Sequence, residues 1–288
     1  MKSASSTQAD VSRQPQPRTG VGHGSARSVL MTVLGELVWP TGKPARTSAL
    51  VYVLNGLGIE ESTARQALIR AADSEWITSH KHGREVSWTL TPYLERVFEE
   101  GAQRVLDLSD PFLDWDSRWL VLFITIPQSQ RSQRKRLYKD LTWAGFGNPS
   151  PGVWLSPHWE RRGQVAKIVD MLGLTRSTMS FHGPVDSVGL SETDIVTNGW
   201  DLESLADDYA RVYEDFRDPA PASEDDLLFT EIRAMGQLQR FPFTDPQLPE
   251  ALLPDWIGRT VVTHIKALRH EWADAVSDRW ATLNDGRC

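Results

Sequence analysis

This chain of 288 residues has only one cysteine, no long apolar run and no overall basic charge, and each of these features narrows its possible functions. The single cysteine, Cys288, excludes an internal disulfide framework and fits a reducing cytoplasm. No apolar run approaches the roughly 20 residues that a helix needs to cross a bilayer, so we expect no membrane span. Residues 1–24 are rich in Ser, Gln, Pro and Gly, which predicts a disordered tail and neither a signal peptide nor a transit sequence.

The net charge of −7 argues against a nucleic-acid partner, but the charges are unevenly distributed. Residues 1–92 hold 10 Lys and Arg against 7 Asp and Glu, whereas the remaining residues hold 21 against 31. A basic N-terminal third on an acidic body suggests a local anionic partner, with the body kept away from it. The length itself favours more than one domain.

Residues 25–92 have the pattern of three helices followed by a hairpin. Apolar residues recur at helical spacing in "SARSVLMTVLGELVW" and "RTSALVYVLNGLG", and a third helix begins at Glu60 or Glu61. The segments "WITSH" and "EVSWTL" alternate as strands do around "KHGR", where Gly83 allows a tight turn. This order predicts a winged helix-turn-helix DNA-binding domain.

The third predicted helix has an apolar side and a polar side. A helical wheel groups the small or apolar residues Ala64, Ala67, Leu68 and Ala71 together. The opposite side of this helix and the hairpin tip supply the predicted DNA contacts: Ser62, Arg65, Gln66, Arg70, Lys81 and Arg84. Arginine can form two hydrogen bonds to guanine and glutamine two to adenine, while basic side chains of the wing neutralise phosphates.

The pattern changes after the hairpin. Residues 93–116 are polar and predict a helical connector. Residues 117–190 alternate strands ("RWLVLFITIP", "PGVWLSPH", "STMSFHGPV") with amphipathic helices, which predicts a small α/β sandwich of ferredoxin-like type. Residues 200–288 return to helical spacing and predict a C-terminal helical domain. The expected fold class is therefore α+β.

Five stretches resemble the PaaX family of bacterial transcription repressors: "SARSVLMTVLGELVWP", "ARQALIRAADSEWI", "WLVLFITIP", "LTWAGFGNPSPGVWLSP" and "RFPFTDPQLPEALLPDWIG". The resemblance extends from about Ser25 to the last helix. It implies a cytoplasmic homodimer that binds double-stranded operator DNA and represses aromatic-acid (phenylacetate-type) catabolism genes. It also implies release by an acyl-CoA thioester effector, phenylacetyl-CoA or a related compound.

An acyl-CoA effector requires basic side chains for its phosphates and an apolar pocket for its acyl group. The candidates for phosphate contact are Arg131, Arg134, Arg161, Arg162 and Arg240. Each of them also suits a solvated helix face. The sequence does not locate the pocket.

A metal-dependent nuclease built on the central domain is the alternative function, because this domain also looks like the ferredoxin-like fold of the CRISPR-adaptation nucleases. Those proteins often place an aspartate near the end of the first strand, where this chain has Thr125. His80 and His82 have metal-like spacing, but no nearby Cys or His completes a zinc site. We therefore expect no catalytic residue, metal or cofactor. A pure protein-interaction module would not explain the basic helix and wing.

Overall fold

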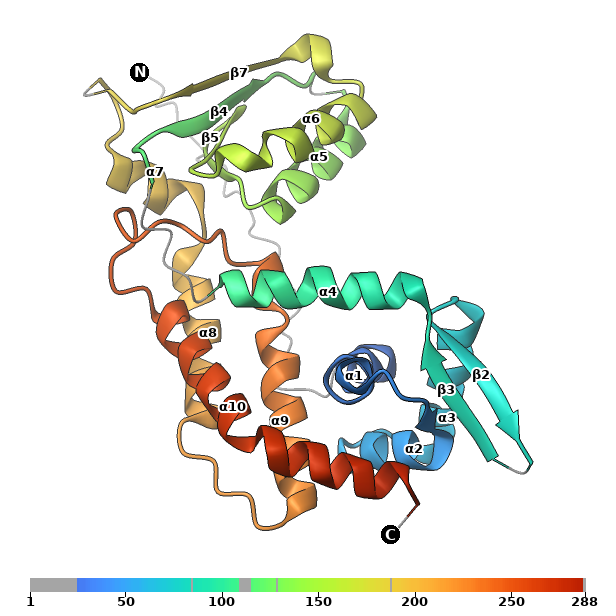
Figure 1. Ribbon diagram of the computed structural model, residues 1–288. Coiled ribbons are helices and arrows are strands. Elements are labelled where there is room, and N and C mark those ends of the chain that lie inside the picture. Colours follow the sequence, from blue (N-terminus) through green and yellow to red (C-terminus); the bar gives the residue numbers. More distant parts are fainter. Residues whose placement is uncertain (1–24, 84, 109–114, 128, 187, 287–288) are drawn as a thin grey trace, which may run out of the picture.

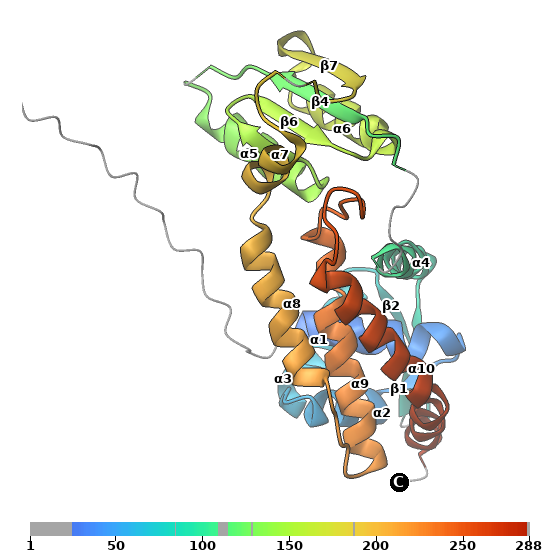
Figure 2. The ribbon, with the colours of Figure 1, turned by 90° about the vertical axis from the view of Figure 1, so that its left-hand side faces the viewer.

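The computed structural model describes residues 25–83, 85–108, 115–127, 129–186 and 188–286. The predicted tail, residues 1–24, lies outside the described residues. Within the described ranges the chain forms ten α-helices and two antiparallel sheets, of three and four strands. The predicted α+β class is confirmed. The four-stranded sheet lies at one end of the molecule, and the N- and C-terminal helices pack together at the other (Figures 1 and 2).

Residues 25–92, the N-terminal module, contain three helices and a hairpin. Their elements are α1 (Ala26–Val33), β1 (Ala45–Arg46), α2 (Thr47–Gly56), α3 (Glu61–Asp73), β2 (Ile77–His82) and β3 (Glu85–Leu90). The Ser25 hydroxyl caps α1 by accepting a hydrogen bond from the Ser28 amide at 3.2 Å. A π turn, η1 (Leu34–Val38), continues α1. Gly58, with a φ of +85°, allows the tight turn between α2 and α3.

Strands β2 and β3 pair over their full lengths and form a hairpin that projects from the helices (Figure 1). Gly83 has a φ of +63° in the turn between them, a conformation that glycine adopts without steric cost. Trp88 fixes β3 to the helices because its indole N–H donates to the Thr47 hydroxyl at 2.9 Å. The short strand β1 pairs with the other edge of β3 and was not predicted.

The hydrophobic core of the N-terminal module continues into the C-terminal helices α9 (Glu224–Leu238) and α10 (Ile257–Asn284). These helices contribute six buried residues to it: Leu228, Ile232, Trp272, Val276, Trp280 and Leu283. The Asn284 side chain adds two bonds, accepting from the Arg46 amide at 2.8 Å and donating to the Pro44 carbonyl at 3.0 Å. The predicted segments 25–92 and 200–288 therefore share one core.

The central segment forms a four-stranded sheet with two helices on one face. Its elements are β4 (Trp119–Ile124), α5 (Arg131–Trp143), β5 (Gly147–Ser150), β6 (Val153–Ser156), α6 (Arg162–Met171) and β7 (Thr178–Gly183). The strand order is β5-β6-β4-β7. Leu120, Leu122 and Ile124 alternate along β4 and pack under α5 and α6.

Strand β5 is missing from the sequence-based expectation, which has three strands in this region. Its sequence is Gly-Asn-Pro-Ser, and none of these residues favours a strand. It lies at the sheet edge, where its pairing with β6 shifts in register, so proline is tolerated there. The pairing with β6, rather than local preference, makes this segment a strand.

The connector and the C-terminal segment are helical. Helix α4 (Pro92–Asp107) forms most of the predicted connector, of which residues 109–114 lie outside the described residues. Helix α7 (Glu192–Gly199) was not predicted and packs beside β5, while α8 (Leu202–Phe216) lies against α9 and α10. No helix in the described ranges is both long and apolar enough to cross a membrane.

Candidate DNA-binding surface and adjoining pocket

Helix α3 divides into a buried face and an exposed face, as its sequence predicts. Ala64, Ala67, Leu68 and Ala71 are all buried against the module's core. The side chains on the other face are all exposed: Ser62, Arg65, Gln66, Ile69 and Arg70. The alanines allow α3 to pack closely on α1 and α2, and this packing leaves the longer polar side chains directed outward.

The two arginines of the exposed face are held by neighbours on the same helix. Arg65 contacts the Glu61 carboxylate, with its Nη2 at 2.8 Å and its Nε at 2.9 Å. Arg70 Nη2 donates to Gln66 Oε1 at 2.9 Å. Exposed pairs of this kind contribute only about 0–1 kcal/mol, so the arginines can exchange these partners for an anion at little cost.

The hairpin adds polar side chains beside this helix. His80 and Lys81 are exposed on β2, and the His80 Nε2 lies 2.8 Å from the Thr89 hydroxyl. Arg84, the remaining predicted wing contact, lies outside the described residues. Helix α3 and β2 are in contact, which places the hairpin beside this helix.

The five predicted effector arginines do not gather at one site. Arg131 is exposed at the start of α5, Arg134 donates to the Ile126 carbonyl, and Arg240 donates to Gln237. Arg162 lines a cavity of about 310 Å³ between α6 and the central sheet.

Arg161 has a structural role in the fold. It donates to the Ala144 carbonyl at 3.0 Å and to Gln247 Oε1 at 3.1 Å, and thus joins the central segment to the C-terminal one. Burial lowers the pKa of Arg161 to about 10. Both terminal nitrogens of Arg161 therefore donate to protein acceptors, which favours a structural role over phosphate contact.

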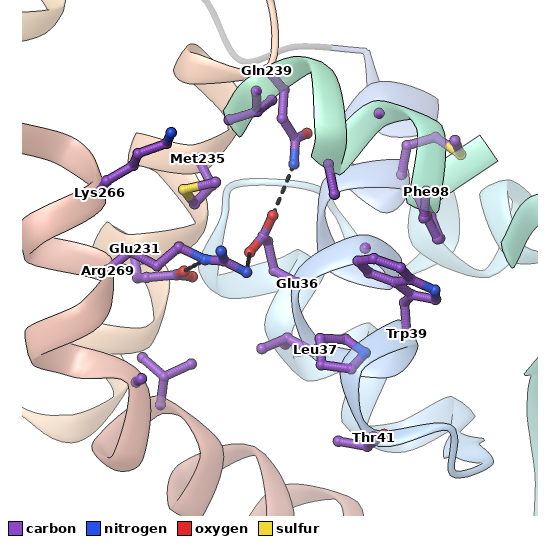
Figure 3. A pocket seen from close by; sticks show the side chains of 18 of the residues that line it. Glu36, Leu37, Trp39, Thr41, Phe98, Glu231, Met235, Gln239, Lys266 and Arg269 are labelled. Atoms are coloured by element: carbon purple, nitrogen blue, oxygen red, sulfur yellow. Dashed lines mark hydrogen bonds and ion pairs between the residues drawn. The ribbon is translucent and has the colours of Figure 1, made fainter. Parts of the chain in front are cut away.

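A cavity of about 750 Å³ lies behind the N-terminal module. It is bounded by η1, α4, α9 and α10 together with the turn that follows α9 (Figure 3). Its walls are largely apolar and include Met31, Leu37, Trp39, Val97, Phe98, Val105, Met235 and Trp280. Cavities of roughly 300–1,000 Å³ with apolar walls and a few polar groups are typical of small-molecule sites.

Two buried carboxylates face one guanidinium in this cavity (Figure 3). Arg269 Nη2 lies 2.9 Å from Glu36 Oε2, and Arg269 Nε lies 3.7 Å from Glu231 Oε1. Glu36 also accepts a hydrogen bond from Gln239 Nε2 at 2.9 Å. Glu36 Oε2 and Glu231 Oε2 are both buried, and neither accepts a hydrogen bond in the described structure, although Glu36 Oε2 has its ion-pair contact with Arg269.

Both carboxyl groups are protonated more readily than usual. Burial raises the pKa of Glu36, although Arg269 and Gln239 oppose the shift. Burial and the nearby Glu36 raise the pKa of Glu231 to about 8. Sequence reasoning missed this group. Two features of the sequence could have indicated it. Glu36 is an acidic residue within the apolar stretch "LGELVW", and Glu231 follows the buried Leu228 by three positions on α9.

The fold suggests a class of protein, and comparison with known proteins identifies the family. Three helices, a projecting hairpin and an exposed helix carrying arginines are the parts of a DNA-binding regulator. The chain belongs to the PaaX family of transcription repressors. Residues 25–94 match "PaaX-like protein", residues 113–195 match "PaaX protein central Cas2-like domain", and residues 200–282 match "PaaX-like protein C-terminal domain".

Two individual proteins are similar to the chain. The Transcriptional repressor PaaX of Escherichia coli (strain K12) is 26% identical over 248 residues, which cover 82% of this chain and 77% of that protein. The solved structure of the uncharacterized protein Rv0674 from Mycobacterium tuberculosis matches with a TM-score of 0.61 and 22% identity. That match covers 90% of this chain and 98% of the other, and it supports the fold alone.

Proposed function

We propose that the chain is a cytoplasmic, homodimeric repressor of phenylacetate-type catabolism genes that binds operator DNA and is released by an acyl-CoA thioester. The family and the similar E. coli repressor support the general role. The exposed face of α3 carries the specific proposal, because it presents Arg65, Gln66 and Arg70 beside a projecting hairpin.

In this proposal residues 25–92 form a winged helix-turn-helix and residues 117–190 a ferredoxin-like domain. The strand and helix order of each segment supports these assignments. Helix α3 enters the major groove, where Ser62, Arg65, Gln66 and Arg70 meet base edges or the flanking backbone. Lys81 and Arg84 contact phosphates. We assign no catalytic activity to the chain, and nothing in the site favours the nuclease alternative.

Dimerisation through the central or C-terminal segment would allow two modules to bind two half-sites of an inverted repeat. The effector then needs a higher affinity for the form that cannot span both half-sites. A typical coupling of ~1–3 kcal/mol would weaken operator binding about 5- to 150-fold.

The decisive experiment measures binding to DNA fragments from the chain's own genomic neighbourhood by fluorescence anisotropy. Arg65→Ala should weaken binding to the specific fragment by ~1–3 kcal/mol and relax base preference, because it removes a base contact. Arg211→Ala is the matched control, since Arg211 is an exposed arginine on α8 that also pairs with an acidic neighbour, Asp208. Equal binding by both variants contradicts the α3 assignment.

Light scattering tests the oligomeric part of the proposal. We expect a dimer in solution and two protomers on one operator. A monomer under both conditions excludes the paired half-site arrangement without affecting the α3 assignment.

A further inference from the structure

The 750 Å³ cavity joins segments that are far apart in the sequence. Its lining comes from residues 31–41, 97–105, 231–243 and 266–280. It therefore lies where the DNA-binding module, α4 and the C-terminal helices meet. A molecule in this cavity would touch all three parts at once, so its affinity can depend on how these parts are arranged.

The polar end of the cavity is formed by Glu36, Glu231, Arg269 and Gln239, and Glu231 is the residue that could donate a hydrogen bond to a ligand. Arg269 forms an ion pair with Glu36 Oε2, and the other oxygen of Glu36 accepts a hydrogen bond from Gln239. Glu231 lies 3.7 Å from the same guanidinium and has one buried oxygen without a partner. Its residue is only 4% exposed, so water does not readily satisfy that oxygen. A carboxyl group that remains protonated in such a site is a hydrogen-bond donor.

We propose that this cavity is a ligand-binding site for an uncharged acyl group on an apolar body, whose carbonyl oxygen accepts a hydrogen bond from the Glu231 carboxyl. The proposal rests on the repressor function above and names its effector site. Thioesters and amides have such a carbonyl. The apolar walls, which include Trp39 and Phe98, accommodate the ring or alkyl part.

The same site disfavours a free carboxylate. A carboxylate ligand would bring a further negative charge beside Glu36 in an environment that is poorly solvated. Arg269 cannot offset it fully because it already faces two protein carboxyl groups. The basic residues Lys266 and His270 line the same cavity from α10, where the anionic tail of a thioester would pass.

The position of Glu36 provides a route to the DNA-binding face. It lies in η1, which continues α1, and α1 packs on α3. Helix α4 fits closely on η1, because a Cβ added at Gly35 would lie 3.3 Å from Phe98 Cε1. A ligand held between α4, η1 and α10 therefore favours one arrangement of α1 relative to α10 and changes the position of α3.

A substitution that fills the cavity tests its location. A Cβ added at Gly101 meets no atom within 4 Å, so Gly101→Leu should fold while it projects into the cavity. Gly163→Leu is the matched control, because Gly163 lies on α6, has equally open surroundings and is remote from the lining. Calorimetry with phenylacetyl-CoA, phenylacetamide and phenylacetate measures binding to the full-length chain.

We expect wild type and Gly163→Leu to bind phenylacetyl-CoA and phenylacetamide, and Gly101→Leu to bind both at least about tenfold more weakly. Phenylacetate should bind wild type at least about tenfold more weakly than phenylacetamide does. Unchanged ligand binding by Gly101→Leu, a preference for phenylacetate, or no binding of either uncharged acyl probe overturns the proposal. Operator titrations without ligand are the separate test of the repressor function, so failure there leaves the cavity result intact.

The role of Glu231 is tested by a pH profile with phenylacetamide. Ionisation of Glu231 near pH 8 removes its donor, so wild-type affinity should fall about tenfold between pH 7 and pH 9. Glu231→Gln keeps an N–H donor and should give a flat profile. The other ionisable residues that line this cavity are Glu36, Lys266, Arg269 and His270, and they are common to both proteins. A flat wild-type profile, or equal slopes in both proteins, overturns the donor role.

Discussion

The N-terminal module and the central sheet differ in how they are attached to the rest of the molecule. The core of the module continues into α9 and α10, where Trp280 is 3% exposed. The central sheet keeps a core of its own under α5 and α6. Its other face packs on the C-terminal segment, where Trp119 and Leu155 share an apolar cluster with Leu248. Arg161 also bonds to Gln247, and Trp143 stacks on Phe243.

This difference indicates which part of the chain can control DNA binding. A change in α9 or α10 alters the packing of the module directly, because their side chains belong to the same core. A change in the central sheet reaches the module only through the intervening segments. The cavity lies on the side of the closer connection, between the module and α10.

Breaking the shared core should have the largest effect on stability. Trp280→Ala removes a buried aromatic side chain and should reduce the free energy of unfolding by ~3–5 kcal/mol. Hydrogen exchange should then accelerate in α2 as well as in α10. Leu141→Ala, in the separate core under α5, should cost ~2–5 kcal/mol while α2 exchange stays near wild type. Equal acceleration in α2 by both variants would remove the distinction between the two regions.

Neutralising the buried acid behind the module should give an effect that depends on pH. The pKa of Glu231 is raised from its usual 4.5 to about 8 in the folded chain, so the unfolded chain loses this proton first. The contribution of Glu231 to the free energy of unfolding is therefore greatest below about pH 4.5, and it decreases as the pH rises to about 8. Glu231→Gln should therefore raise stability by ~1–3 kcal/mol at pH 9 and change it little at pH 4.5.

Urea unfolding at the two pH values measures this difference. Glu271→Gln is the control, because Glu271 is exposed on α10 and should change neither value appreciably. A gain from Glu231→Gln that is the same at pH 4.5 and pH 9 would indicate a packing effect rather than the cost of a buried charge.

A smaller effect is expected at the polar contact between α2 and the C-terminal helices. The Tyr52 hydroxyl donates to Asp225 Oδ2 at 2.7 Å, and Arg279 Nε donates to Asp225 Oδ1 at 2.7 Å. Tyr52→Phe should reduce the free energy of unfolding by ~0.5–1.5 kcal/mol. The value should lie toward the lower end because Tyr52 is 42% exposed. The exposed Tyr93 supplies the control variant, Tyr93→Phe, which should be neutral in the same urea titration.

The pH dependence at this contact has the opposite sign to that of Glu231. Arg279 and the Tyr52 hydroxyl lower the pKa of Asp225 below its usual 3.8. Its contribution is therefore present above about pH 3.8 and lost as the pH falls through the lower folded value. The cost of Tyr52→Phe should shrink in that acid range, and a cost that grows there would contradict the pairing.

The smallest effect is expected at the wing. Lys81→Ala should weaken binding to all DNA sequences similarly and reduce the slope of log affinity against log salt by about one. Lys139→Ala, an exposed lysine on α5, should leave the slope unchanged. A loss confined to one DNA sequence would make Lys81 a base contact instead of a phosphate contact.

Much of the fold follows from local patterns. Helices α8, α9 and α10 lie where apolar spacing predicts them, and α10 ends at Asn284, one residue beyond the expected Leu283. The two faces of α3 follow from the same periodicity, so the placement of Arg65 on its exposed face could be predicted. Strand β5 could not be predicted, since its residues become a strand only through their pairing with β6.

The sequence by itself determined the α+β class, the order of its segments and the polar face of α3, because each depends on residues that are close along the chain. Only the tertiary structure decided that α9 and α10 complete the core of the N-terminal module, and that Glu36 and Glu231 meet at Arg269. These two acids are nearly 200 positions apart, and the protonation of each depends on what excludes water from it. That exclusion is a property of packing between distant segments, and no local pattern encodes it.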